Sequence, residues 1–333
     1  MGATRTDAKT QACSLSAVYG HRLDLPIIYT QGVALNERLR LFKTGTLPRD
    51  PAPEIAKMVA PFMAAPAEAF GAKPGTANYA GVCWAESLFR ATGDARYSDL
   101  LLYVADRVAP ADLHGVSMLD PGARVEDFFF ASVVLGGAFS LTGDTCYAAV
   151  LTRYLLDART QQRNGLWWHC RASPYFWGRG NGFAALGFAE TLSRLPSGHP
   201  SRGALVKSHL RHIEALRRHQ DSSGMWRQVI DEPRSYLEHS ATSMIGCAIA
   251  RGVRLGWLPE EWKDTAGRAW EAVSQRTGSD GRLERVCVGT GPQPDLQAYL
   301  DRPFTDGRDD RGGAMALCFA GEMAALENRP AQE

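Results

Sequence analysis

ATGDARYSDLLLYVADR at residues 91–107 and LTGDTCYAAVLTRYLLDAR at residues 141–159 are two copies of one pattern. Their Thr-Gly-Asp triplets begin at Thr92 and Thr142, 50 residues apart. Each copy predicts a helix, a tight turn and a second helix, because glycine closes a helix in the left-handed conformation and aspartate caps the next one. The chain therefore contains a repeated helical hairpin.

A second repeat lies in the segments RNGLWWH, SSGMWRQ and SDGRLER. Their glycines, Gly165, Gly224 and Gly281, lie 59 and 57 residues apart. Each segment follows a stretch with helical spacing, and each predicts a turn and a short extended piece. Together the two repeats indicate a structural unit of roughly 50 to 60 residues.

Apolar residues recur at helical spacing in other segments, such as GFAALGFAETLSRL (182–195) and RGGAMALCFAGEMAAL (311–326). Alternating valine-rich segments long enough to build a sheet are missing. One helical hairpin cannot bury its own apolar face, so it stacks on neighbours, and about six such units fit into this length. We therefore predict an all-α fold, an (α/α)6 barrel whose six hairpins close around a central pit. An open solenoid is the alternative arrangement.

We expect residues 1–333 to form a single domain, because no linker or charge block divides the chain. Residues 1–20 are expected to be a poorly ordered N-terminal segment of that domain. Residues 21–75 show only pieces of helical pattern separated by proline. This pattern fits a first hairpin with an irregular connection.

The composition excludes several classes of partner. The chain has 37 Lys and Arg residues against 36 Asp and Glu residues, so neither nucleic acid nor an anionic membrane is expected. No run approaches the ~20 apolar residues of a membrane span, and the start lacks the apolar core of a signal peptide. Seven scattered cysteines complete the prediction of a cytoplasmic protein. Without histidine pairs at metal-ligand spacing or a glycine-flanked nucleophilic serine, we expect no metal or other cofactor, and chemistry by carboxylates.

The segment SPYFWGRGN (173–181) combines bulky aromatics, an arginine and glycines. We predict a loop that enters an inner helix near Gly182 and faces the pit. There Trp177 would offer a flat face to a sugar ring, and Arg179 would hold a carboxylate with its forked donors. His169 ends a short extended piece that would point to the same pit. The alternative is a loop and a histidine with structural roles only.

The segment GARVEDFFFASVVLGG (122–137) places Glu126 and Asp127 at the start of another apolar helix. Acidic residues at the start of a helix often only cap it and interact favourably with its dipole. Beside three phenylalanines, however, desolvation raises the pKa of an acid towards the range that a proton donor needs. Neighbours on a helix diverge by about 100°, so only one of the two can face the pit. We predict that it is Glu126.

A third polar and aromatic cluster lies in GMWRQVIDEPRSYLEHSATSM (224–244). We expect Trp226, Gln228 and Tyr236 to bind the substrate. The charged run at 309–311 precedes the last inner helix and is expected to be mainly solvated.

The blocks at 177–183 and 224–244 resemble the motifs W-G-R-G-N-G-W and G-x-W-x-Q-V-x-D … S-Y-x-E-x-S-x-T-x-M of glycoside hydrolase family 105. These are the unsaturated rhamnogalacturonyl hydrolases, and the chain is more distantly similar to family 88, the unsaturated glucuronyl hydrolases. The resemblance runs from about residue 78 to residue 325 and implies an (α/α)6 barrel. It also implies that one acid protonates the C4=C5 double bond of a terminal unsaturated uronic acid and then helps water to add at C5.

The resemblance assigns roles to particular residues. The ungapped register puts Glu126 on the catalytic aspartate of the family and Asp127 on the variable position beside it. His169 and Arg179 fall on positions near the double bond and the carboxylate, while Trp177 and Asn181 fall on the matching loop. We therefore expect Glu126, Asp127 and His169 to be catalytic. The loop residues are expected to bind substrate.

The expected protein is a glycoside hydrolase that releases a terminal unsaturated uronic acid from small, acidic oligosaccharides. One alternative is a hydrolase of saturated uronic acid glycosides or other glycosides, with a second carboxyl from Asp231, Glu238 or Asp309. Another is a carbohydrate-binding α/α toroid without catalysis. The sequence leaves the oligomeric state open.

Overall fold

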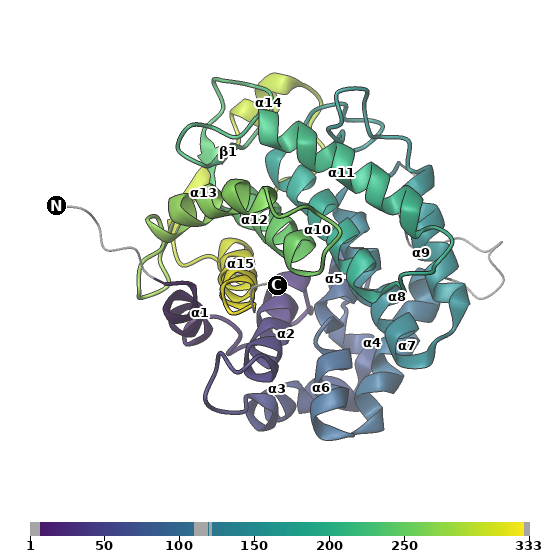
Figure 1. Cartoon of the computed structure of the whole chain (residues 1–333). Coiled ribbons are helices and arrows are strands. Elements are labelled where there is room, and N and C mark those ends of the chain that lie inside the picture. The colour runs from purple at the N-terminus through teal and green to yellow at the C-terminus, as the bar shows by residue number, and fades with distance from the viewer. Residues whose placement is uncertain (1–6, 110–118, 120–121, 330–333) are drawn as a thin grey trace.

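The computed structural model describes residues 7–109, 119 and 122–329, which are mostly helical (Figure 1). The helices are α1 (Ala8–Ser16), α2 (Tyr29–Lys43), α3 (Ala52–Ala64), α4 (Pro66–Ala69), α5 (Thr76–Tyr79), the 3-10 helix η1 (Ala80–Val82), α6 (Ala85–Thr92), α7 (Ala95–Val108), α8 (Glu126–Thr142), α9 (Thr145–Asp157), α10 (Gly178–Arg194), α11 (Arg202–Arg218), α12 (His239–Arg254), α13 (Trp262–Ser274), α14 (Leu296–Leu300) and α15 (Asp310–Glu327). The strands are β1 (Trp226–Arg227), β2 (Leu237–Glu238), β3 (Leu283–Cys287) and β4 (Phe304–Gly307), and they form the antiparallel pairs β1–β2 and β3–β4.

An inner ring of helices forms the wall of a barrel. Within the described residues it consists of α2, α6, α8, α10, α12 and α15, and each of these packs against the next. The ring closes because α15 also packs against α2, and Figure 1 shows these two helices side by side. Closure excludes an open solenoid. The predicted all-α (α/α)6 barrel is confirmed.

Outer helices cover this ring. Helices α7, α9, α11 and α13 each pack against the inner helix that precedes them, and α3 packs against α6. The outer partner of α15 comes from the opposite end of the chain, because α1 packs against α15. The first and last helices of the described chain thus form the pair that completes the barrel.

This arrangement corrects the prediction that residues 1–20 are poorly ordered. Residues 1–6 lie outside the described part, but α1 is a capped helix in which Asp7 accepts a hydrogen bond from the backbone N–H of Thr10 at 2.9 Å. Its apolar face, with Ala8, Ala12 and Leu15, is buried. Local sequence pattern carries no sign of this order because the partner helix lies about 300 residues further on.

The Thr-Gly-Asp turns have the predicted geometry. Gly93 and Gly143 follow α6 and α8 with left-handed φ angles of +73° and +72°. Asp94 and Asp144 then accept hydrogen bonds from the first backbone N–H groups of α7 and α9, at 3.1 and 2.8 Å. Each turn therefore ends one helix and starts the next within three residues.

The second glycine repeat docks a turn onto the next outer helix. A Cβ atom on Gly165 would lie 2.6 Å from the carbonyl oxygen of Arg211 in α11, and one on Gly224 would lie 2.3 Å from that of Arg268 in α13. At Gly281 the same atom would lie 2.7 Å from Val18, just after α1. The third glycine turn therefore packs beside α1 in the way that the first two pack on the outer helices α11 and α13. This packing agrees with the position of α1 as an outer helix of the barrel.

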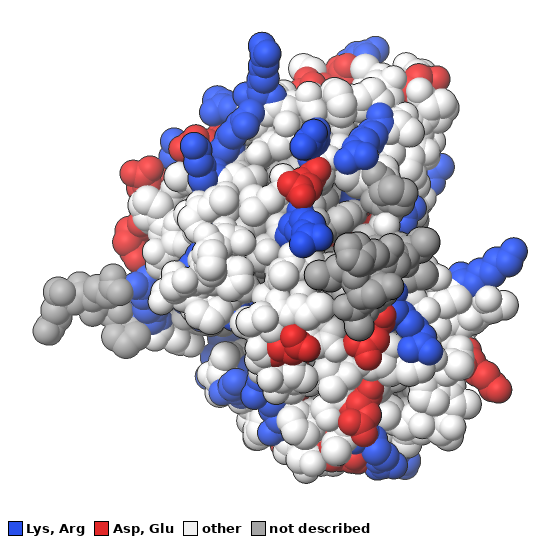
Figure 2. Space-filling view, turned by 90° about the vertical axis from the view of Figure 1, so that its right-hand side faces the viewer, with Lys and Arg blue, Asp and Glu red and all other residues white. Residues whose placement is uncertain are grey.

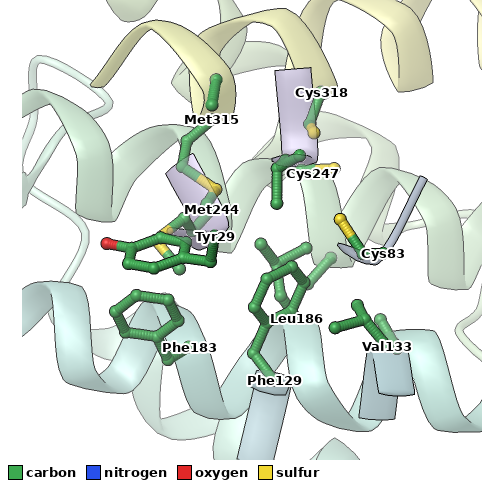
Figure 3. Close-up of a cluster of buried hydrophobic side chains, with 14 of the residues drawn as sticks. Tyr29, Cys83, Phe129, Val133, Phe183, Leu186, Met244, Cys247, Met315 and Cys318 are labelled. Atoms are coloured by element: carbon green, nitrogen blue, oxygen red, sulfur yellow. The ribbon is translucent and has the colours of Figure 1, made fainter. Parts of the chain in front are cut away.

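The middle of the barrel is filled by aromatic and sulfur-containing side chains. Figure 3 shows Tyr29 and Phe183 together on one side, and the cysteines Cys83, Cys247 and Cys318 on the other. All five are buried. Burial raises the pKa of the Cys83 and Cys247 thiols to about 12, so they remain protonated and behave as small apolar groups.

Ion pairs close the end of the barrel where the inner helices finish. Arg251 of α12 pairs with Glu322 of α15 at 2.9 Å and also with Glu190 of α10. Glu190 in turn pairs with Arg194 at 2.5 Å and with Arg40 of α2 at 3.4 Å. This ion-pair network links the last turns of several inner helices.

The surface carries both signs of charge. Figure 2 shows Lys and Arg interspersed with Asp and Glu over one face, as the near balance of charges predicts. None of the helices in the described residues combines the length and the hydropathy of a membrane span.

Candidate active site

A cavity of about 610 Å³ lies at the end of the barrel where the inner helices begin. The starts of α2, α8, α10 and α15 line it, together with residues 289–291 after β3. The N–H groups of a helix start carry partial positive charge, so this arrangement favours an anionic ligand. The charged lining residues are Arg22, Asp24, Arg124, Glu126, Arg179, Arg308, Asp309, Asp310 and Arg311.

Glu126 and Asp127 point in different directions from the first turn of α8. Glu126 lines the cavity and is 8% exposed. Asp127 is fully buried, does not line the cavity and accepts a hydrogen bond from the hydroxyl of Thr76 in α5. The structure thus corrects the prediction of a catalytic Asp127, because this carboxyl ties α8 to α5.

The environment of Glu126 combines opposing influences. One oxygen, Oε1, lies 3.1 Å from Nε2 of His169, while Oε2 is buried and has no hydrogen-bond partner among the described residues. Burial favours the neutral carboxyl, but His169 and then Arg124 outweigh it and hold the pKa of Glu126 below its ordinary value. The expected net rise in the pKa of Glu126 is therefore wrong, although burial acts in that direction.

His169 lies behind Glu126 and is completely buried. Its ring stacks on the indole of Trp177 with a centroid distance of 4.5 Å, and its Nδ1 lies 2.5 Å from the hydroxyl of Tyr299 in α14. Trp177 lines the cavity but is only 2% exposed. The indole therefore holds neighbouring side chains in place, whereas an open face for a sugar was predicted.

Arg179 faces the cavity from the first turn of α10 with its guanidinium anchored on one side. Nη1 donates to the carbonyl of Cys287 at 2.5 Å, and Nη2 donates to that of Val288 at 2.7 Å. Nε is buried without a hydrogen-bond partner in the described part of the chain. No described carboxylate forms an ion pair with Arg179, which rests 4.8 Å from the centre of the Trp177 ring.

The site residues Glu126, His169 and Arg179 all fall within a recognisable family segment. Residues 125–326, more than half of the chain, match the sequence profile of Glycosyl Hydrolase Family 88. The chain belongs to this family. The relationship predicted from the sequence motifs is confirmed.

Curated relatives of this family-88 chain match it over shorter segments. It is 31% identical over 157 residues to "Unsaturated rhamnogalacturonyl hydrolase YesR" of Bacillus subtilis (strain 168), covering 47% of this chain and 44% of that protein. It is 34% identical over 134 residues to "Unsaturated 3S-rhamnoglycuronyl hydrolase" of Alteromonas sp. (strain LOR), covering 38% and 32%. The matched segments thus span less than half of each relative.

Solved structures match nearly the whole chain. A possible member of the GH105 family from Salmonella enterica superposes with a TM-score of 0.81 at 21% identity, covering 98% of this chain and 96% of that one. The unsaturated glucuronyl hydrolase from Bacillus sp. GL1 superposes with a TM-score of 0.70 at 16% identity, covering 97% and 95%. These similarities establish a shared fold.

Asn181, which was predicted to bind substrate, lies below the cavity of this family-88 fold. It is fully buried; its amide N–H groups donate to the carbonyls of Trp167 and Trp177, and its carbonyl accepts from the backbone N–H of Trp167, all at 3.0 Å. With these bonds it fixes the loop that carries Trp177. Its motif position therefore reflects loop geometry.

Three further predicted substrate contacts also lie outside the cavity lining. The indole N–H of Trp226 donates to the carbonyl of Leu216 at 2.7 Å, Gln228 accepts from the hydroxyl of Ser235 at 3.2 Å, and the hydroxyl of Tyr236 donates to the carbonyl of Pro303 at 3.4 Å. These bonds hold the turn between α11 and α12. Their binding roles remain predictions, and the structure shows structural bonds for all three side chains.

Several cavity residues were missed. The run at 309–311 lines the cavity, whereas it was expected to be mainly solvated. Arg311 pairs with Asp309 and Arg22 pairs with Asp310, both at 2.8 Å. The ring of Tyr29 packs in the apolar wall, with its centroid 4.9 Å from that of Phe130 and 5.5 Å from that of Phe183. Residues 22–31 carry no motif that could have placed them there.

Proposed function

We propose that this chain is a glycoside hydrolase that releases a terminal unsaturated uronic acid from small oligosaccharides. The observation that carries the proposal is a pair of buried polar atoms on two cavity residues, Oε2 of Glu126 and Nε of Arg179, which have no hydrogen-bond partner among residues 7–109, 119 and 122–329. A guanidinium edge suits the uronate carboxylate, and a carboxyl can transfer the proton that the double bond needs. The family and the names of the curated relatives point the same way.

In the proposed reaction Glu126 acts first as acid and then as base. Its proton goes to C4 of the C4=C5 bond, and positive charge develops at C5. Water adds its oxygen to C5 and returns one proton to Glu126. The hemiketal at C5 then opens to a ketone, and the former glycosidic carbon becomes an aldehyde as the neighbouring sugar leaves as an alcohol. One water is consumed and the carboxyl is regenerated.

Substrate binding would itself favour protonation of Glu126. The pKa of Glu126 lies below its ordinary value because His169 and Arg124 outweigh burial. A uronate held at Arg179 brings a negative charge into the cavity and displaces water, and both effects favour the protonated carboxyl. The substrate therefore helps to put the proton where the reaction needs it.

The other cavity carboxylates argue against an ordinary glycosidase. That mechanism needs two carboxyl groups about 5 to 9.5 Å apart across the scissile bond. Asp309 pairs with Arg311 and accepts from the backbone N–H groups at the start of α15, and Asp310 pairs with Arg22. Asp24 also lies beside Arg22, at 3.6 Å, and accepts a hydrogen bond from Gln31 at 2.7 Å. Glu238 caps α12 and Asp231 does not line the cavity. Glu126 is therefore the carboxyl suited to proton transfer.

The proposal includes a single catalytic domain, an acidic oligosaccharide as substrate and a cytoplasmic location. The seven cysteines, five of them buried, form no disulfide among the described residues, and this supports a reducing compartment.

Ultraviolet absorbance tests the function, because the C4=C5 bond conjugated to the carboxylate absorbs near the ultraviolet edge and a hydrated product does not. We expect wild-type protein to remove the absorbance of lyase-generated unsaturated disaccharides while the neighbouring sugar appears. Sugar release with unchanged absorbance would instead indicate an ordinary glycosidase. Binding without either change would indicate a carbohydrate-binding toroid.

A further inference from the structure

A chain of buried hydrogen bonds runs from Glu126 away from the cavity. His169 connects Glu126 to Tyr299, and the hydroxyl of Tyr299 lies 2.7 Å from the hydroxyl of Ser173. His169 and Tyr299 are completely buried, and Ser173 is 1% exposed. Tyr299 and Ser173 lie outside the cavity lining, and the proposed reaction has not used them.

The direction of each bond follows from the number of protons available. Ser173 lies 2.8 Å from the carbonyl oxygen of Gln293, where only the serine can donate. Its oxygen must therefore accept the single hydroxyl proton of Tyr299. The oxygen of Tyr299 accepts from the backbone N–H of Gln293 at 3.2 Å. It has no proton left for His169, so Nδ1 of His169 must carry the proton of their 2.5 Å contact.

We infer that Tyr299, held by Ser173, is a positioning residue that keeps His169 protonated at Nδ1, so that Nε2 and Oε1 of Glu126 share one proton. Without that proton a lone pair on Nε2 would face a carboxylate oxygen. Moving the proton from Nδ1 to Nε2 would leave Nδ1 facing an oxygen that cannot donate. The network thus opposes loss of the shared proton. This proton is the one that Glu126 delivers if the proposed function holds.

Other charged and titratable groups surround the pair. Arg124 and Tyr29 lie close enough to Glu126 to interact with its charge, and Cys170 does the same for Tyr299. Arg179 and His169 both lie against the Trp177 ring. Burial raises the pKa of Tyr299 to about 12, so its hydroxyl keeps its proton across the working range of an enzyme. The shared proton between Glu126 and His169 is therefore the one that this network regulates.

Two substitutions test the inference through the pH profile. In Tyr299→Phe the ring remains but Nδ1 loses its acceptor, so the Nε2-protonated form is no longer disfavoured. In Ser173→Ala the hydroxyl of Tyr299 can donate its proton to Nδ1 of His169, which also favours the Nε2-protonated form of the histidine. We expect both to move the basic limb of kcat/KM to lower pH by about one unit. Tyr175→Phe removes a neighbouring phenol outside the network and should leave the limb in place.

The tautomer can be read without substrate. Long-range 1H–15N NMR of the free wild-type protein, with His169→Gln for assignment, should show Nδ1 protonated at every pH where the protein is folded. In Ser173→Ala the alkaline form should be protonated at Nε2. Circular dichroism and thermal unfolding establish that each variant folds.

A wild-type His169 protonated only at Nε2, or variants whose basic limb does not move, would overturn the inference. Because the NMR measurement needs no turnover, it separates this inference from the proposed function. An inactive protein with the expected tautomer would contradict only the function, and an active one with the opposite tautomer would contradict only the network.

Discussion

At the scale of single residues, two cavity side chains have polar atoms that lack hydrogen-bond partners among the described residues. Oε2 of Glu126 and Nε of Arg179 are buried without partners among the described residues. A buried polar atom without a hydrogen bond costs about 1 to 3 kcal/mol, so a ligand that bonds to these two atoms would recover that cost. Both atoms suit a uronate better than a neutral sugar.

Arg179→Lys tests the recognition of the carboxylate. Lysine keeps the charge but loses the planar fork, the anchoring bonds to Cys287 and Val288 and the contact with Trp177. We expect kcat/KM for an unsaturated uronide to fall by roughly a hundredfold, and the fall for its methyl ester to be much smaller. Arg308→Lys, on the exposed rim, is the matched control. Equal losses on acid and ester would remove Arg179 from this role.

At the scale of elements, glycine turns dock the loops that surround the cavity. Gly224 has a φ of +89° and no room for a Cβ, whereas Gly143 has a φ of +72° and open space around it. Both would suffer the backbone cost of a left-handed residue, about 1 to 2 kcal/mol. Only the first would also push a turn away from the backbone of α13.

We therefore expect Gly224→Ala to lower the free energy of unfolding by clearly more than Gly143→Ala does. Urea denaturation followed by circular dichroism measures both. Equal losses in the two variants would mean that docking of the turn on Arg268 contributes nothing to stability.

The N-terminal helix offers a second test at this scale. Leu15 of α1 is 1% exposed, and its loss would leave a cavity beside α15. Leu15→Ala should lower the free energy of unfolding by about 2 to 5 kcal/mol. The exposed Leu156→Ala should change it by less than about 0.5 kcal/mol. If Leu15→Ala left the free energy of unfolding unchanged, the N-terminal segment would not be packed on the barrel as described.

At the scale of the whole molecule, an ion-pair network at one end of the barrel stands opposite a cavity at the other. Glu190 pairs with Arg40, Arg194 and Arg251, and despite burial these arginines hold its pKa well below the ordinary value. Glu37 lies beside the same Arg40, but burial outweighs its neighbours and raises its pKa. The two carboxyls therefore have opposite effects on stability at neutral pH.

Glu190→Gln should cost about 3 to 5 kcal/mol of unfolding free energy at pH 7, because it leaves buried arginines without a partner. A lowered native pKa stabilises the fold above the unfolded pKa and loses this effect as the pH falls through the native value. The difference from wild type should therefore persist at pH 5 and shrink in stronger acid. Glu37→Gln should cause no loss at pH 7. Equal destabilisation by both would contradict this account of the network.

Sequence reasoning reached the features that depend on short-range pattern. The Thr-Gly-Asp turns and the divergence of Glu126 from Asp127 follow from helix geometry alone. It missed α1 and the cavity residues at 22–31, because their partners lie far away in the chain. It also gave Asn181 and Gln228 binding roles, since a motif preserves loop-forming residues as well as site residues. Distinguishing the two required the hydrogen bonds.

The central claim for the whole molecule is that Glu126 protonates C4 of an unsaturated uronide. Turnover in D2O followed by proton NMR tests it most directly, with Asp127→Asn as a matched control that removes a neighbouring carboxyl outside the cavity. We predict that wild type and Asp127→Asn place one deuterium at C4 of the released product, and that Glu126→Gln places none and leaves the double bond intact. Deuterium at C4 with Glu126→Gln at an undiminished rate, or sugar release with the double bond preserved, would contradict the claim.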